Sequence, residues 1–278
     1  FQWIRGELIG KGNYGRVYMA LNASTGEVMA VKQVEVPHHS EKTSQQKEII
    51  DALKFEGETL ENIEHPNIVQ FLGYEESQDC WSMFLEYVPG GTIESCLRRH
   101  GPFSEELTKS FTSQMLRGLD YLHNGGIMHR DLKSANILVE QAGVCKISDF
   151  GVSKHVGLLE SQIAHTGLKG TVYWMAPEVV NSHKAGYDLK VDIWSVGCIV
   201  LEMWTGKRPW YGEEAVPVML KLYTHQSAPP LPPNHPQLSP LASDFRERCF
   251  MPQPSERPTA AELLEHPYLV PDPEWSFT

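Results

Sequence analysis

The sequence has few cysteines and none of the spacings that build metal cages or disulfide frameworks. Its five cysteines form no CxxC pair, and their odd count leaves one without a mate. Structural zinc sites and disulfide-rich secreted domains both need cysteines in short, paired spacings. These two classes are therefore excluded, and we expect reduced thiols in a cytoplasmic protein.

A hydrophobic run long enough to cross a membrane is also missing. The longest apolar stretch, Ile193 to Leu201, is flanked by Asp192 and Glu202. A membrane-spanning helix needs about 20 apolar residues. We interpret the stretch as a buried core helix and expect no membrane insertion.

Positive charge is scarce as well. Lys and Arg number 24 against 35 Asp and Glu, which gives a formal net charge of −11, and no basic block stands out. Nucleic acid is therefore not expected as the main partner, and a site for an anionic ligand has to be built locally.

The sequence begins with Phe1 rather than Met, without a charged-then-apolar leader. We expect an excised domain of a longer protein, with regulatory regions outside it.

The composition and patterning suit a globular protein with two regions of different character. The hydrophobic fraction is 41% of 278 residues, enough for a substantial core. Residues 7–22, 27–36 and 81–88 carry β-branched and aromatic residues around glycine turns and predict strands. Residues 44–63 predict a helix whose apolar face contains Ile49, Ala52, Leu53, Phe55, Leu60 and Ile63.

Long helical patterns dominate after residues 88–91, notably in 105–123. There Leu107, Phe111, Met115, Leu119 and Leu122 form one stripe. We expect a small sheet followed by a larger helical body, with a hinge near Glu86 to Gly91. Ligands often bind between two such regions.

The stretch GKGNYGRV places Gly10, Gly12 and Gly15 ahead of Val17. Without Cβ atoms, a backbone can approach a polyphosphate and direct its N–H groups at it. A tight hairpin turn explains the pattern equally well. Because the glycines lie between two predicted strands instead of opening a helix, they do not indicate a Rossmann dinucleotide site.

Lys32 ends the apolar stretch MAVK. An unpaired ammonium would be costly to bury in such a strand, so it should have anionic partners. Glu56 on the following predicted helix and the phosphates of a nucleotide could supply them. The alternative is a lysine that reaches out to solvent.

The stretch HRDLKSAN, residues 129–136, concentrates polar chemistry. Asp131 could accept the proton of a substrate hydroxyl, Lys133 could neutralise charge on a moving phosphoryl group, and Asn136 offers an amide oxygen to a hard cation. Asp149 in ISDFG offers a carboxylate to the same cation. Two oxygen ligands from different segments suit a phosphate-bridging Mg²⁺, which keeps water and substrate oxygens as well.

The glycine-rich stretch, MAVK, HRDLKSAN, DFG and APE follow one another in an order and spacing that resemble a eukaryotic protein kinase over essentially the whole chain. This resemblance implies an α+β, bilobal fold with a small N-terminal sheet lobe containing one main helix (1–87). It implies a larger, mainly helical C-terminal lobe (88–278) and an activation segment (149–178). Lys133 after HRDL, together with GT ahead of YWMAPE, is similar to the serine/threonine type.

The resemblance also implies roles for individual residues, with ATP and Mg²⁺ as cofactors. Lys32 would hold the α- and β-phosphates and pair with Glu56, with Glu58 as the fallback partner. Thr171 would bond Asp131 and Lys133, and Asn136 and Asp149 would hold the metal. The remaining expected nucleotide contacts are the loop residues Gly10, Lys11, Gly12 and Gly15, the ring contacts Ile9, Val17, Ala30 and Leu138, the gatekeeper Leu85, and the backbones of Glu86 and Val88.

Structural roles follow from the same resemblance. Glu178 would pair with Arg257, and Asp192 would brace the catalytic loop. Leu60, Phe71, His129 and Phe150 would stack as a spine. Arg130 is well placed to capture a phosphate on the activation segment, where Ser161, Thr166 and Thr171 carry hydroxyls and Thr166 fits best.

Stretches such as HPNIVQFLGYE and VDIWSVGCIVLEMWTGKRPW resemble the MAP kinase kinase kinases, especially those of the fungal cell-wall-integrity pathway. That similarity implies a MAP kinase kinase as the protein substrate. Two alternatives stay open: a pseudokinase that acts as a scaffold on the same fold, and a metabolic kinase. Lys32, Asp131 and Asp149 are all present, whereas their loss is the usual sign of a pseudokinase.

Overall fold

The computed structural model describes residues 2–12, 15–35, 44–77, 80–150, 154–155, 172–181, 188–233 and 235–277, without the side chains of 44–49, 52 and 154–155. The chain forms two compact units. The first is Phe1–Pro89 with Asp149–Val152, and the second is Gly90–Ser148 with Ser153–Thr278. The first division falls within the stretch where the sequence predicts a hinge, and the lobe boundary at 87/88 stays a prediction.

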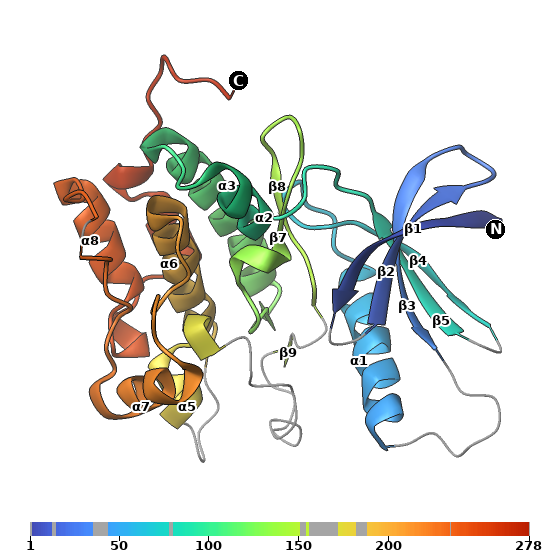
Figure 1. Cartoon of the computed structure of the whole chain (residues 1–278), viewed down its shortest axis with the longest axis horizontal. Helices are drawn as coiled ribbons and strands as arrows, with labels where there is room; N and C mark the ends of the chain where they lie inside the picture. Colours follow the sequence, from blue (N-terminus) through green and yellow to red (C-terminus); the bar gives the residue numbers. More distant parts are fainter. Residues whose placement is uncertain are drawn as a thin grey trace. The chain divides into compact units, whose positions relative to one another are not determined.

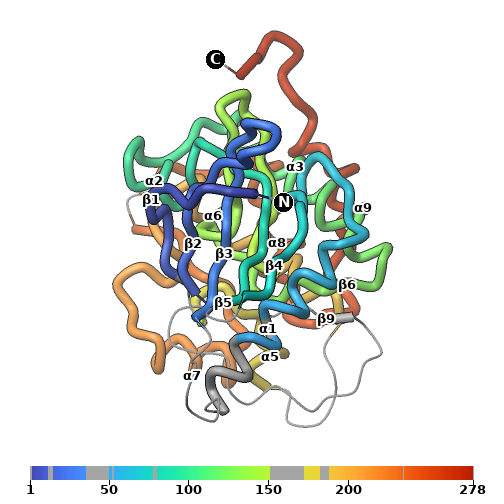
Figure 2. Tube along the Cα trace, turned by 90° about the vertical axis from the view of Figure 1, so that its right-hand side faces the viewer, coloured from blue at the N-terminus to red at the C-terminus, as the bar shows by residue number. Residues whose placement is uncertain are grey.

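An antiparallel sheet dominates the described part of the first unit, with its strands in the order β1-β2-β3-β5-β4 (Figures 1 and 2). The elements are β1 (Trp3–Gly12), β2 (Gly15–Asn22), β3 (Val28–Glu35), α1 (Ser44–Leu60), β4 (Phe71–Glu76) and β5 (Cys80–Glu86). The strands and the helix expected from the sequence are confirmed.

Two details of this unit differ from the sequence prediction. Strand β4 has no predicted counterpart, because most of its residues are exposed and Gly73 adopts a φ of 136° beside a register shift. Helix α1 ends at Leu60 instead of residue 63, and the amide of Ile63 closes a turn on the Leu60 carbonyl. On the predicted apolar face Leu53 is buried and Phe55 half-buried, while the side chains of Ile49 and Ala52 lie outside the described residues.

The sheet buries apolar side chains on both faces. On one face Ala20, Met29, Val31 and Phe84 form a cluster that Trp3 covers, its ring meeting Phe84 edge-on at 5.4 Å. On the other face α1 packs against β4 and β5. Gly57 lies on the side of α1 that faces the sheet, where a Cβ would be 3.4 Å from the Phe71 ring, an ordinary contact distance. The close packing brings the neighbouring residue Glu56 toward the sheet.

The second unit is mainly helical, as expected. Its described elements are α2 (Ile93–His100), α3 (Glu105–Asn124), β6 (Ile127–Met128), η1 (Ser134–Asn136), β7 (Ile137–Val139), β8 (Cys145–Ile147), β9 (Lys154–His155), η2 (Val172–Trp174), α5 (Pro177–Asn181), α6 (Lys190–Thr205), α7 (Ala215–His225), α8 (Pro240–Cys249), η3 (Pro254–Glu256), α9 (Ala260–Leu264) and η4 (Pro267–Leu269). Strand β7 pairs with β8, and β6 pairs with β9.

Helix α6 forms the centre of this unit. It lies between α3 and α8 (Figure 1) and contacts both. All its residues from Val191 to Trp204 are buried, so the predicted core helix is confirmed. On α3 the predicted stripe is also buried, apart from the half-buried Leu107. Within the described part of the chain, no helix combines the length and apolar character needed to span a membrane.

Candidate active site

Lys32 on β3 binds two carboxylates within the first unit. Its Nζ lies 2.6 Å from Glu56 Oε2 and 2.8 Å from Asp149 Oδ1, and its side chain is 7% exposed. Burial alone would lower the pKa of Lys32, but the carboxylates of Asp149 and Glu56 outweigh it and raise the pKa above its ordinary value. The lysine is therefore a fixed positive charge, and the solvent-facing alternative is wrong.

Glu56 on α1 is held from two directions. Its Oε2 accepts from Lys32, and its Oε1 accepts from the Phe150 amide at 3.2 Å. Burial raises the pKa of Glu56, and the Lys32 ammonium acts against that shift. Glu58 is exposed, so the predicted fallback partner is not the one used. Asp149 completes the group with a left-handed φ of 66°.

The glycine-rich stretch forms the hairpin of β1 and β2. Gly10 pairs with Val17, Lys11 with Arg16, and Gly12 with Gly15. Gly15 adopts a φ of 140°, and a Cβ there would lie 2.3 Å from the carbonyl oxygen of Gln33. Glycine is therefore required at this position by backbone conformation and by space.

The residues predicted to contact the adenine belong to both units and differ in burial. In the first unit, Val17 pairs with Lys32 and Ala30 pairs with Leu85, so these side chains share one face of the sheet. Leu85 is buried, Val88 is half-buried, and the amide of Glu86 donates to the Gln70 carbonyl. Ile9 and Lys11 are exposed, and Leu138 is half-buried on β7 in the second unit.

In the second unit, two of the predicted catalytic-loop residues, Lys133 and Asn136, contact the third, Asp131. Lys133 Nζ lies 2.7 Å from Asp131 Oδ2. Asn136 Nδ2 donates to the Asp131 backbone carbonyl at 2.8 Å and to Oδ2 at 3.1 Å. Because both bonds use the amide nitrogen, the amide oxygen is the atom with which Asn136 could hold a cation. The loop therefore presents a carboxylate, an ammonium and an amide oxygen in one place.

Asp192 on α6 holds the backbone of this loop, as the sequence predicts. Its fully buried carboxylate accepts from the amides of His129 and Arg130 at 2.9 and 2.8 Å, and from His123 Nε2 at 3.0 Å. Burial would raise the pKa of Asp192, but the bond from His123 and the nearby donors outweigh it and lower the pKa. Arg130 has a φ of 69°, a strained conformation that these bonds maintain.

His123 was not singled out from the sequence. It lies near the end of an amphipathic helix, where pattern alone does not separate a surface histidine from one that bonds a buried carboxylate. The direct contact between Lys32 and Asp149 was also not predicted as a pair, since the two residues are far apart in the sequence.

The β7–β8 hairpin joins two predicted metal ligands. Asn136 directly precedes β7, and Ser148 and Asp149 follow β8. The Ser148 amide and hydroxyl both donate to the Asn136 carbonyl, each at 2.9 Å. His129 Nε2 donates to the Ser148 carbonyl at 3.1 Å. The backbone leading into Asp149 is thus tied to the catalytic loop.

The predicted pair of Glu178 and Arg257 is confirmed. Arg257 Nη1 and Nη2 lie 2.7 and 3.2 Å from the two carboxylate oxygens of Glu178, and the arginine side chain is fully buried. Among the expected spine residues, Leu60, His129 and Phe150 are buried and Phe71 is half-buried. Their stacking stays a prediction.

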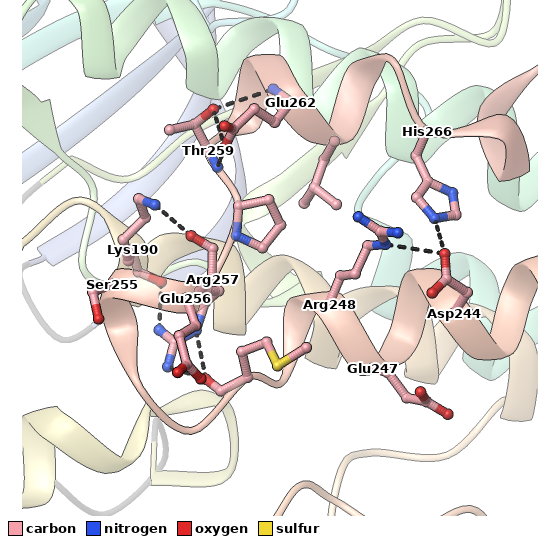
Figure 3. A pocket seen from close by; sticks show the side chains of 13 residues that line it. Lys190, Asp244, Glu247, Arg248, Ser255, Glu256, Arg257, Thr259, Glu262 and His266 are labelled. Atoms are coloured by element: carbon pink, nitrogen blue, oxygen red, sulfur yellow. Dashed lines mark hydrogen bonds and ion pairs between the residues drawn. The ribbon is translucent and has the colours of Figure 1, made fainter.

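A cavity of about 610 Å³ lies beside Arg257 in the second unit, between α8 and α9 (Figure 3). Three of its lining residues, Asp244, Arg248 and His266, bond one another. Asp244 accepts from His266 at 2.7 Å and from Arg248 at 3.0 Å, and these bonds lower the pKa of Asp244. Lys190 donates to the Arg257 carbonyl. None of the residues predicted for ATP or magnesium lines this cavity.

Several predictions concern residues outside the described ranges. Thr171, with its expected bonds to Asp131 and Lys133, is among them. The same holds for Ser161 and Thr166, the candidate phosphorylation sites. Their roles stay predictions.

Residues 3–269 match the family model of the protein kinase domain. The chain therefore belongs to the protein kinase family, as its motifs and its fold indicate, and this membership implies the use of ATP.

Among its relatives, the chain is 48% identical over 280 residues to the MAP kinase kinase kinase mkh1 of Schizosaccharomyces pombe, covering 100% of the chain and 25% of that protein. It is 51% identical over 269 residues to the serine/threonine-protein kinase BCK1/SLK1/SSP31 of Saccharomyces cerevisiae, covering 96% and 18%. Identity is 45% over 269 residues to the mitogen-activated protein kinase kinase kinase ANP1 of Arabidopsis thaliana, covering 96% and 40%. The chain thus spans less than half of the length of each of these relatives. The predicted resemblance to the MAP kinase kinase kinases is confirmed.

Proposed function

We propose that this chain is an ATP- and Mg²⁺-dependent serine/threonine protein kinase that phosphorylates a MAP kinase kinase. The observation that carries the proposal is the buried Lys32 ammonium between Glu56 and Asp149. A pseudokinase has no need to keep these three groups in contact. The relatives named as MAP kinase kinase kinases support the substrate class.

The residues present fit a magnesium-bound nucleotide. Asp149 and Asn136 offer carboxylate and amide oxygens, the ligand types that Mg²⁺ prefers, and the side chain of Asp149 is 35% exposed. The described residues contain no cluster of three or more histidines, cysteines and acids that could hold a metal. We therefore assign the remaining ligands to phosphate oxygens and water. When bound, Mg²⁺–ATP supplies the phosphoryl group and neutralises part of its charge.

The side chains of the chain position and activate the reactants. Lys32 orients the α- and β-phosphates, while Glu56 fixes the direction of its ammonium. Asp131 orients the acceptor hydroxyl and accepts its proton, and Lys133 offsets negative charge on the transferred group. Such positioning is the main requirement of phosphoryl transfer, because little covalent help is needed.

The nucleotide contacts complete the proposal. The backbone of the β1–β2 hairpin, including Gly10, Lys11, Gly12 and Gly15, would cover the phosphates of bound ATP. Ile9, Val17, Ala30 and Leu138 would contact its adenine ring, and Leu85, Glu86 and Val88 would line the edge of the ring. Thr171, which lies outside the described residues, would bond Asp131 and Lys133. None of the five cysteines, all in the described part of the chain, forms a disulfide, in keeping with a cytoplasmic protein.

Incubation of the chain with labelled ATP, Mg²⁺ and a panel of purified MAP kinase kinases tests this function. We expect label on serine or threonine residues of at least one of them, mapped by mass spectrometry, and no label with the D131N variant. ATP binding without any transfer to protein would establish the pseudokinase alternative instead. Transfer to small metabolites and not to protein would establish a metabolic kinase.

A further inference from the structure

The C-terminal residues 270–277, here called the C-terminal strap, lie near α3 and the β7–β8 hairpin in both views of the second unit (Figures 1 and 2). The Asp272 amide donates to Glu106 Oε2 on α3 at 3.1 Å. The centroid of the Phe277 ring lies 6.5 Å from that of the buried Phe111 ring, also on α3. Most of the strap is exposed, and Phe277 itself is 42% exposed.

Phe277 covers the turn of the β7–β8 hairpin at Gly143. Gly143 has a left-handed φ of 77°, and a Cβ built on it would lie 2.5 Å from the Phe277 ring. Hairpin turns usually face solvent, whereas Gly143 is buried. The covering ring explains this burial. Glycine therefore fits position 143 both by its backbone conformation and by the space that the ring takes.

Helix α3 holds the same turn through the side chain of Gln114. Gln114 Nε2 donates to the Gly143 carbonyl at 2.9 Å, and Gln114 Oε1 accepts from the Cys145 amide at 2.9 Å. The Cys145 thiol donates to the Phe111 carbonyl at 3.6 Å. The turn is thus bonded to α3 and covered by the strap.

The other end of this hairpin carries the proposed metal ligands. Asn136 directly precedes β7, and Ser148, which bonds the Asn136 carbonyl, directly precedes Asp149. Each strand has three residues and so spans about 10 Å. Because the hairpin is this short, a tilt of its turn also moves Asn136 and the backbone that leads into Asp149.

We propose that Phe277 is a positioning residue that orients the proposed metal ligands by fixing the turn of the β7–β8 hairpin. It touches neither ATP nor the acceptor hydroxyl, and it acts through Gly143 and the two short strands. Because the strap is largely exposed, it can detach without unfolding the second unit, and its detachment weakens the binding of Mg²⁺–ATP. The kinetic consequence of this inference rests on the proposed kinase function.

Gly143 and Phe277 permit a double-mutant cycle. F277A removes the ring, and G143A places a methyl group where the ring lies and displaces it. In the double variant the methyl group meets no ring, so the two effects should not add. F277Y keeps the ring. G26A is the matched control for backbone strain, because Gly26 has the same φ of 77° and a Cβ there would have no atom within 4 Å.

Hydrogen–deuterium exchange of the chain without nucleotide provides a readout that does not depend on activity. We expect faster exchange in peptides covering 137–147 and 270–277 for F277A and G143A. The same peptides of F277Y and G26A should exchange as in the parent chain. Parental exchange of 137–147 in F277A would overturn the proposal.

Steady-state kinetics on a MAP kinase kinase provide the second readout. We expect F277A and G143A each to raise the ATP KM, and the Mg²⁺ concentration that gives half-maximal activity, by about threefold or more. The acceptor KM should stay within about twofold of the parent value. The double variant should resemble F277A, while F277Y and G26A should retain the parent values.

Two kinetic results would contradict this role of Phe277. An effect in the double variant equal to the product of the single effects would show that Gly143 and Phe277 act independently. A lower melting temperature of F277A with unchanged ATP and Mg²⁺ dependence would leave the strap a purely structural element. If the parent chain transfers no phosphate, the proposed function fails, and the exchange data still decide whether Phe277 fixes the hairpin. If one single variant does not fold, the other gives the same readouts, since both release the same contact.

Discussion

The ammonium of Lys32 is the most constrained charge in the proposed site. It is buried, and both of its carboxylate partners lie within 2.8 Å. Removing one member of a buried ion pair leaves the other charge without compensation, which commonly costs about 3–5 kcal/mol. We expect K32M to lower the free energy of unfolding by about 3 kcal/mol and to abolish phosphoryl transfer, measured by chemical denaturation and by the kinase assay.

A surface lysine on α1 provides a matched control. Lys54 lies 3.7 Å from Glu76, and the two side chains are 43% and 59% exposed. Exposed pairs contribute about 1 kcal/mol or less. K54M should therefore leave activity unchanged and stability nearly so. Equal losses of unfolding free energy in K32M and K54M would contradict the role given to the buried ion pairs of Lys32.

Glu202, a buried acid on α6, makes a separate prediction about stability and pH. Burial raises its pKa from 4.5 to about 8 on folding, so between these values the folded chain binds a proton that the unfolded chain releases. Stability from this group is therefore fully present below about pH 4.5 and is lost as the pH rises through about 8. The melting temperature of E202Q minus that of the parent should increase across this window, since a glutamine does not titrate. A constant difference would show that Glu202 is already charged in the folded chain.

The β1–β2 hairpin depends on the conformation of one glycine. Gly15 and Gly26 both adopt a positive φ, but the Cβ of an alanine would meet the Gln33 carbonyl at Gly15 and nothing within 4 Å at Gly26. We expect G15A to raise the ATP KM at least about tenfold, since the phosphate-covering backbone has to move. G26A should cost about 1 kcal/mol of stability and leave the ATP KM unchanged. Equal KM values for the two variants would contradict this role of Gly15.

Helix α6 organises the second unit through side chains at several of its turns. Asp192 near its start holds the His129 and Arg130 amides, and Glu202 near its end holds Ser134 and Trp174. The catalytic loop, residues 129–136, is therefore attached to this buried helix both at the start of the loop and near the end of the loop. A helix that is apolar all round, with a few bonded acids, can supply such a rigid support.

The residues proposed to bind the nucleotide and its metal belong to both compact units. Lys32 and Asp149 are in the first unit and Asn136 is in the second. A ligand that binds the folded chain and not the unfolded chain raises its melting temperature by mass action. We expect Mg²⁺–ATP to raise the melting temperature in proportion to the logarithm of its concentration. Removal of Mg²⁺ with EDTA should abolish most of this shift, and D149N should reduce it. A shift of equal size in EDTA would contradict the assignment of Asp149 and Asn136 as metal ligands.

Most of the fold follows from local patterns. The alternation in 7–22 and 27–36 and the stripe in 105–123 correspond to β1, β2, β3 and α3, because burial of one face imposes these periods. Strand β4 escaped prediction because it is largely exposed and interrupted by Gly73. The predicted end of α1 is wrong because one apolar residue beyond Leu60, Ile63, continues the pattern without continuing the helix.

The sequence by itself determined the family, and it predicts the chemistry and the residues proposed to perform it, because phosphate, metal and proton transfer require particular functional groups at short, characteristic spacings. The tertiary structure decided which of these groups meet. It brought Lys32 onto Asp149, a partner 117 positions away, selected Glu56 over Glu58, and placed His123 on Asp192 and Glu202 between Ser134 and Trp174. Such contacts depend on which face each helix presents and on burial. Burial removes water from a charged group, so that the group needs a partner.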